Sequence, residues 1–160
     1  MTDTRWLSDD ERRAWLRFAA VLELLPAALD VQLTRDEHLT HFDYFTLAML
    51  SEAPDRVLRT SALAARTNAT LPRLSRVLTR LEGEGFIART PCEADRRATN
   101  VTLTETGWQQ VVAAAPGHVE NVRALVLDVL TPTQIAQLGE ISAALLTTLD
   151  PQGKMFASES

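Results

Sequence analysis

The sequence contains few of the residues on which disulfides, phosphate-binding loops and many catalytic sites depend. Its 160 residues include one cysteine and six scattered glycines, and only 6% of them are aromatic. The single thiol, Cys92, cannot form an internal disulfide, which fits a reducing compartment. No Gly-rich phosphate loop, Ser/His/Asp arrangement or metal-ligand cluster can be placed on the sequence. The sequence therefore predicts neither an enzyme nor a bound cofactor.

Long hydrophobic runs are also missing. No segment approaches the ~18 apolar residues of a membrane span, and residues 1–6 lack the basic and then apolar pattern of a signal peptide. These features predict a cytoplasmic protein without a membrane partner. Hydrophobic residues nevertheless make up 46% of the chain, enough to bury the core of one domain with helical extensions.

Positive charge is scarce and is concentrated in one segment. The chain has a net charge of −5, yet residues 56–97 hold nine arginines against four acidic residues. The segments before and after this one are both acidic in sum. A basic segment of this kind is typical of a protein in which one surface meets nucleic-acid phosphate. The alternative is a helical interaction protein whose basic segment binds an acidic partner.

Helical periodicity is strongest near the N-terminus. Apolar residues recur at three- and four-residue steps and predict a helix over residues 8–34, bent at Pro26. Thr40 and Asp43 are spaced as an N-terminal capping pair, which predicts a second helix over residues 42–51. We expect most of this second helix to be buried.

Two short helices around a turn at residues 68–69 form a predicted helix-turn-helix. We expect Thr60 to cap the first, residues 61–67, and Thr70 to cap the second, whose first turn contains Pro72. The second helix has an apolar side of Leu74, Val77, Leu78 and Leu81, and a polar side of Thr70, Pro72, Arg73, Ser75, Arg76, Thr79 and Arg80. Arginines and hydroxyls on one face suit the DNA major groove, where they can bond base edges and phosphates.

A β-hairpin is predicted after this helix. Residues 86–90 and 99–103 are rich enough in β-branched or apolar residues to pair as strands, and their connection carries Arg96 and Arg97. A hairpin beside a helix-turn-helix is a wing. We therefore predict that both arginines contact the DNA minor groove or phosphates.

Further helices are predicted after the hairpin. One is expected to begin at a Thr104 cap and to be kinked or interrupted at Pro116-Gly117, and another begins at Thr131–Gln134. Together with the N-terminal helix they carry more apolar surface than a small winged core needs. Some of that surface is predicted to close a dimer.

Three motifs in order resemble the pattern of the MarR family of bacterial transcription regulators. They are Leu81-Glu-x-x-Gly85, Asp95-x-Arg97 and Leu103-Thr-x-x-Gly107. The resemblance covers residues 8–150 and implies a mainly α fold with a small β-hairpin wing. It implies an N-terminal dimerisation helix (1–35), a winged helix-turn-helix domain (36–104), C-terminal dimerisation helices (105–150) and a tail (151–160).

The resemblance also implies a function. Two winged domains of a homodimer would bind a palindromic site on double-stranded DNA, with repression as the commoner outcome in the family and activation as the alternative. Arg97 is implied to enter the minor groove. Asp95 is implied to brace the wing against a recognition-helix arginine such as Arg80.

A small aromatic effector is a further partner that the resemblance implies. Trp15, Phe18, Tyr44 and Phe45 are the candidate lining of its pocket, and plain core packing is the alternative.

Two other residue types have little support as sites. Cys92, at the base of the predicted wing, is an incidental thiol or an oxidation site. The three histidines, His38, His41 and His118, offer too few ligands to predict a zinc site.

Overall fold

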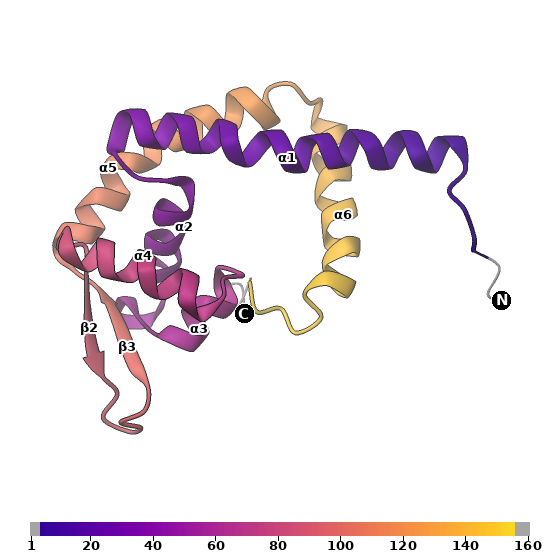
Figure 1. The fold of residues 1–160 in the computed structure, drawn as a ribbon. Coiled ribbons are helices and arrows are strands. Elements are labelled where there is room, and N and C mark those ends of the chain that lie inside the picture. Colours follow the sequence, from indigo (N-terminus) through magenta and orange to yellow (C-terminus); the bar gives the residue numbers. More distant parts are fainter. Residues whose placement is uncertain (1–3, 156–160) are drawn as a thin grey trace.

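The computed structural model describes residues 4–155 and is mainly helical (Figure 1). Its helices are α1 (Asp9–Glu37), α2 (His41–Ser51), α3 (Thr60–Arg66), α4 (Leu71–Gly83), α5 (Glu105–Val122) and α6 (Pro132–Leu149). Its strands are β1 (Val57–Arg59), β2 (Ile87–Pro91) and β3 (Thr99–Leu103). A 3-10 turn, η1 (Pro54–Arg56), precedes β1, and a π-helical turn, η2 (Arg123–Leu127), follows α5. The predicted fold class, mainly α with a small winged sheet, is confirmed.

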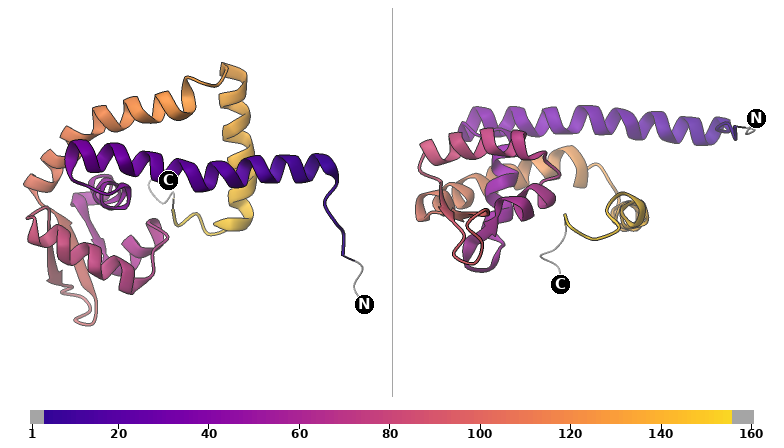
Figure 2. Two further views of the ribbon diagram at one scale, coloured as in Figure 1. Left: turned by 45° about the horizontal axis from the view of Figure 1, so that its top comes forward. Right: turned by 60° about the horizontal axis from the view of Figure 1, so that its bottom comes forward.

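The long helix α1 begins where the sequence predicts it. Ser8 Oγ accepts the amide of Glu11 at 3.2 Å, and the Glu11 carboxylate accepts the amide of Ser8 at 2.8 Å, which completes a capping box. The helix continues through Pro26 without a break and ends at Glu37, where His38 adopts a left-handed conformation with φ 57°. Figure 2 shows that the N-terminal end of α1 projects beyond α6.

A leucine-rich core lies between α2, α3, α4 and the sheet. Its fully buried members are Leu47, Leu50, Leu63, Leu74, Leu78, Leu81 and Val101. The predicted apolar side of α4 is thereby confirmed, with Val77 partly buried at its margin. Each leucine buried in this way contributes about 1.5–3 kcal/mol to folding. This burial fixes which face of α4 is left for solvent.

The three strands form one antiparallel sheet in the order β1-β3-β2. Ile87 lies opposite Leu103, and Val57 lies opposite Thr102. The β2–β3 hairpin is the predicted wing, with its first strand one residue later than expected. Strand β1 was not predicted from the sequence, because three residues are too few to show an alternating pattern.

The prediction that Thr60 caps α3 is wrong. Thr60 is the first residue of the helix, and the preceding Arg59 makes no side-chain cap. The Thr60 hydroxyl instead donates to the carbonyl of Thr99 at 3.1 Å, because β1 leads straight into α3 and places that hydroxyl beside β3. Thr70 does cap α4, and its hydroxyl accepts the amide of Arg73 at 3.4 Å.

Two motif glycines lie where the end of α4 touches the start of α5. Gly85 has a φ of +77°, a conformation that side chains disfavour. A Cβ on Gly107 would lie 2.1 Å from the carbonyl oxygen of Phe86. Thr104 joins the two sites, since its hydroxyl donates to the Gly85 carbonyl at 2.6 Å and accepts the Gly107 amide at 3.0 Å.

The helix α5 is not interrupted at Pro116-Gly117; it runs unbroken to Val122 and bends along its length (Figure 1). The loss of regular α-helix comes later, at η2. After it, α6 begins with the predicted capping box between Thr131 and Gln134. None of the 18 residues of α6 is buried.

The chain ends with the predicted tail, of which the structure describes residues 151–155. The Asp150 carboxylate accepts the amides of Lys154 and Met155 at 3.0 and 2.9 Å, so this part forms a turn. The remainder of the predicted tail, residues 156–160, lies outside the described residues. Within the described chain, no helix is both long and apolar enough to span a membrane.

Candidate nucleic-acid interface

The exposed face of α4 and the hairpin tip form the basic surface that the sequence predicts. The exposed residues on this surface are Thr70, Pro72, Arg73, Ser75, Arg76, Thr79 and Arg80 on α4, and Arg96 and Arg97 on the wing. Both elements project from the same end of the molecule in Figure 1. The structure therefore brings the predicted helix and wing residues to one end of the molecule, but it does not leave all of their side chains free.

Two of the three α4 arginines are engaged within the protein. The guanidinium of Arg73 lies over the ring of Phe42, 4.1 Å from its centroid. Arg80 makes a two-pronged ion pair with Asp43 of α2, with one N–O distance of 2.7 Å. Arg76 bonds only weakly to its own helix, through Nε and the Pro72 carbonyl at 3.4 Å. Arg76 is thus the α4 arginine that can reach outward at least cost.

Asp43 is the buried anchor of this arrangement. Its side chain is fully buried, and it accepts the Thr40 amide at 2.8 Å as well as the Arg80 guanidinium. Burial alone would raise the pKa of Asp43, but the hydrogen bonds from Arg80 and Thr40 outweigh it and lower the pKa below its ordinary value. Asp43 therefore stays ionised and ties α4 to α2.

Asp95 does not brace the wing against Arg80, so this implied contact is wrong. Asp95 instead accepts the amide of Arg97 at 3.0 Å and shapes the hairpin tip. The contact that joins wing and helix is between Glu82 and Arg89, where the carboxylate accepts both the Arg89 side chain, at 2.6 Å, and its backbone amide. Arg80 is not available to Asp95, because it is paired with the buried Asp43, whereas Asp95 lies at the exposed hairpin tip.

A hollow of about 380 Å³ separates α4 from the wing. Arg59 and Ser61 line it from β1 and α3, Leu71 and Ser75 from α4, and Arg97 from the wing. Sequence reasoning missed Arg59 and Leu71 as surface candidates. Arg59 was visible as part of the basic segment, but its place beside the wing depends on the pairing of β1 with β3.

Cys92 lies buried at the base of the wing. Backbone hydrogen bonds from Asp95 and Ala94 lower the pKa of its thiol; burial opposes them, and Arg59 assists them. The Arg59 guanidinium lies 3.6 Å from the sulfur. The thiol therefore helps to position Arg59 next to the hollow.

The four candidate effector residues lie on two helices, α1 and α2. Trp15 and Phe18 form an edge-to-face pair on α1, with 6.5 Å between ring centroids. Tyr44 and Phe45 lie on α2, next to His118 and His41 respectively. The four side chains thus form two groups, one on α1 and one beside the histidines of α2 and α5, and a pocket that they share stays a prediction.

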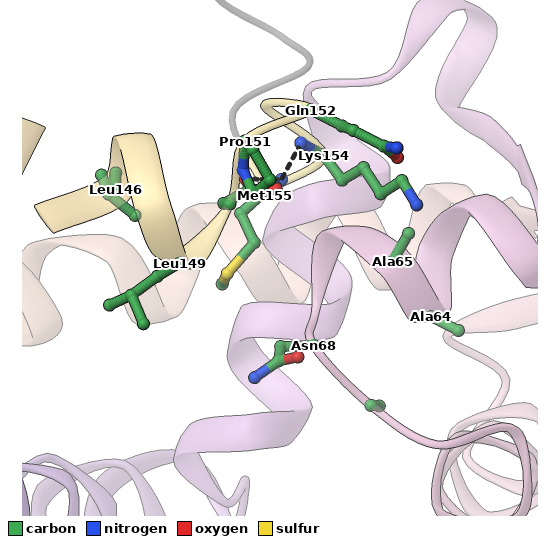
Figure 3. A pocket seen from close by; sticks show the side chains of 11 residues that line it. Ala64, Ala65, Asn68, Leu146, Leu149, Pro151, Gln152, Lys154 and Met155 are labelled. Carbon is green, nitrogen blue, oxygen red and sulfur yellow. Dashed lines mark hydrogen bonds between the residues drawn. The ribbon is translucent and has the colours of Figure 1, made fainter. Parts of the chain in front are cut away.

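Two other hollows involve the terminal helices. Phe18 lines an apolar groove of about 580 Å³ between α1, η2 and α6, together with Leu22, Leu25, Val129 and Leu138. The second hollow, about 700 Å³, lies between α3 and the end of α6, and Asn68 and Met155 are among the residues that line it (Figure 3). No group of three or more potential metal ligands occurs among the described residues.

The family model for the MarR family matches residues 39–99, which span α2 to the start of β3. Sco3205 of Streptomyces coelicolor, a MarR family transcriptional regulator whose structure was solved in complex with DNA, is 38% identical, with a TM-score of 0.89 over 95% of each chain. AbsC, a MarR family regulator from the same organism, is 36% identical, with a TM-score of 0.86 over 93% of this chain and all of AbsC.

Two further relatives match a smaller share of the chain. The transcriptional regulator PecS of Dickeya dadantii is 42% identical over 55 residues, which are 34% of this chain and 31% of PecS. The transcriptional repressor YetL of Bacillus subtilis is 26% identical over 116 residues, or 67% of this chain and 70% of YetL. Motifs, fold and full-length similarity coincide, and the chain belongs to the MarR family of transcriptional regulators.

Proposed function

We propose that the protein is a homodimeric repressor that binds a palindromic operator in double-stranded DNA. The observation that carries this proposal is a basic, exposed helix and wing on a chain of net charge −5. Arg76, Arg96 and Arg97 have no ion-pair partner among the residues that the structure describes, so their charges are available to phosphate. The similar Sco3205 was solved in complex with DNA, which supports DNA binding by this chain. Regulators of this kind bind DNA and catalyse no reaction.

The dimer is proposed from the uncovered apolar faces of α1 and α6. The apolar groove that contains Phe18, Leu22 and Leu138 is open, and α6 has no buried residue of its own. Exposed apolar patches of this extent are typical of interfaces, and a second copy with two-fold symmetry would cover both. Segments 1–35 and 105–150 are thus the proposed dimerisation helices, on either side of the winged domain 36–104.

Operator geometry and repression follow from the dimer. Two recognition helices related by two-fold symmetry fit half-sites about one helical turn apart, roughly 10 base pairs centre to centre. A dimer bound across a promoter excludes polymerase, and the similar YetL is named a repressor. The proposed contacts are the exposed α4 residues, with Arg97 in the minor groove and Arg96 on phosphate.

Release by a small aromatic effector is the proposed regulation. Its proposed site is on α2, where Tyr44 lies 4.6 Å from His118 between ring centroids. A phenolic acid should raise the thermal midpoint of the free protein and weaken the DNA complex, because a ligand shifts an equilibrium only by its differential affinity. Tyr44→Ala should lose both effects, whereas Trp15→Ala should keep both.

Selection of random duplex DNA by the purified protein tests the main proposal. We expect an enriched palindrome that an Arg76→Ala/Arg97→Ala variant no longer recovers. With three to four phosphates neutralised per subunit, log affinity should fall with log salt concentration at a slope of about −5 to −7. Absence of enrichment, or a slope near zero, would overturn the proposal and favour an acidic protein partner.

A further inference from the structure

The outward face of α4 presents fewer polar groups than its sequence suggests. Arg73 lies over Phe42, and Arg80 is held by Asp43. Thr79 donates to the Ser75 carbonyl at 3.0 Å and accepts Arg89 at 3.3 Å. The side chains left for a base edge are therefore those of the first turns of the helix.

Leu71 is the apolar side chain among them. It is the first residue of α4, and 55% of it is exposed, whereas Leu74, Leu78 and Leu81 of the same helix are buried. Leu71 does not belong to the leucine core; it lines the hollow between α4 and the wing. A large apolar side chain in this position gains free energy only when another surface covers it.

The surroundings of Leu71 indicate what covers it. Arg59 and Arg97 line the same hollow, and Ser61 and Ser75 supply hydroxyls. One carboxylate, Asp95, also lines it, so the two guanidinium groups leave the hollow positive in sum. Two guanidinium groups in one hollow with a leucine match a duplex, which presents phosphates beside its groove and base edges within it. The ordinary bases present one apolar group in the major groove, the 5-methyl group of thymine.

We infer that Leu71 packs against a thymine 5-methyl group and selects thymine at one position in each half-site. This inference rests on the proposed function, because it requires α4 to lie in the major groove. The N-terminal residues of a recognition helix are the ones that contact base edges, which is where Leu71 lies. In this arrangement Arg59 contacts a phosphate and Arg97 enters the minor groove, and these contacts hold the helix in register. Leu71 contributes the selectivity for thymine.

The test uses the duplex recovered by selection and a series in which each thymine in turn is replaced by deoxyuridine. This base keeps the pairing and the O4 acceptor and lacks only the methyl group. For the wild-type protein, one thymine position per half-site should show about four-fold weaker binding, the effect of leaving one methyl group uncovered. Replacing both symmetry-related thymines should multiply the two losses.

Two variants separate the inference from general effects. Leu71→Ala should bind the thymine and deoxyuridine duplexes equally well, because the partner of the methyl group is gone. Leu7→Ala is the matched control, since Leu7 is 57% exposed but lies before α1, far from the wing; it should keep the wild-type ratio. Leu71 is exposed, so its loss should leave the thermal midpoint nearly unchanged.

The outcomes are distinguishable. Equal binding of every deoxyuridine duplex by the wild-type protein, or a methyl effect that survives in Leu71→Ala, would overturn the inference while leaving the proposed function intact. Failure of the selection to enrich any duplex would overturn both.

Discussion

Helices α4 and α6 both carry an apolar stripe, and they use it in opposite ways. On α4 three leucines are fully or almost fully buried within the chain. On α6 Ile141 and Leu145 remain exposed, and Figure 2 shows this helix standing apart from the winged body. The difference teaches that amphipathic periodicity predicts a helix and its apolar side, but not whether that side meets the same chain or another one.

The largest expected effect comes from changing the exposed apolar stripe of α6. Ile141→Glu with Leu145→Glu should raise the dissociation constant of the dimer at least about 100-fold, because two carboxylates per chain would have to be buried without partners. Sedimentation velocity measures the change. Thr147→Glu, on the opposite side of α6, is the matched control and should remain dimeric. A dimeric double variant would contradict the proposed interface.

The second largest effect comes from truncating a buried leucine of α4. Leu78→Ala should lower the free energy of unfolding by about 3–5 kcal/mol, because Leu78 is almost completely buried and its truncation leaves a cavity. Leu71→Ala, an exposed leucine on the same helix, should cost less than about 0.5 kcal/mol. Urea unfolding of both variants makes the measurement. Similar costs for the two would show that α4 does not pack as described.

The third effect sharpens the role of charge at the recognition helix. Arg80→Ala should cost about 2–3 kcal/mol of stability, less than the ~3–5 kcal/mol of a fully buried pair, because 47% of the Arg80 side chain is exposed. Arg76→Ala should cost little stability and should weaken DNA binding. The reverse pattern in urea unfolding and binding assays would contradict the assignment of these two arginines.

The same pair should show a defined pH dependence. The pKa of Asp43 is lowered by folding, so its stabilisation is fully present above the ordinary value of 3.8 and is lost as pH falls through the lowered folded pKa. The stability difference between wild type and Arg80→Ala should therefore be largest near neutral pH and shrink in acid. A difference that stays constant down to pH 2 would contradict the ion pair.

The smallest effect concerns the histidines between α2 and α5. Burial lowers the pKa of His41 and of His118; nearby Asp30 partly offsets this for His41, and His41 itself adds to it for His118. A histidine whose pKa is lowered by folding does not reduce stability above pH 6.5, where it is neutral in both states. The free energy of unfolding falls as pH drops below that value. Thermal midpoints from pH 8 to 5 should fall less for His41→Gln/His118→Gln. An unchanged slope would show that these groups are not buried as described.

Much of the fold could be predicted because its signals are local. The caps at Thr40, Thr70, Thr104 and Thr131 place helix starts within a residue or two. A cap is formed between residues three apart, so the sequence contains all of it. Thr60 shows the limit of such predictions. Its hydroxyl donates to the carbonyl of Thr99, far along the chain, and does not cap α3.

The candidate site was predicted less completely, because the state of each arginine depends on residues far along the chain. Arg80 and Asp43 are 37 positions apart, and Arg59 and Cys92 are 33 apart. No local pattern in the sequence indicates that residues so far apart along the chain will pair. The four aromatic residues were grouped by type, whereas the structure pairs Trp15 with Phe18 on α1 and places Tyr44 and Phe45 beside His118 and His41.

By itself the sequence determined the family, the helices, the wing and the basic segment, since periodicity, capping pairs and motif glycines act over a few residues. Only the tertiary structure decided which arginines are free, that Leu71 lies outside the leucine core, and that the stripe of α6 is left uncovered. The physical reason is that ion pairing and burial are properties of packed surfaces. Which surfaces meet is settled when the whole chain has folded.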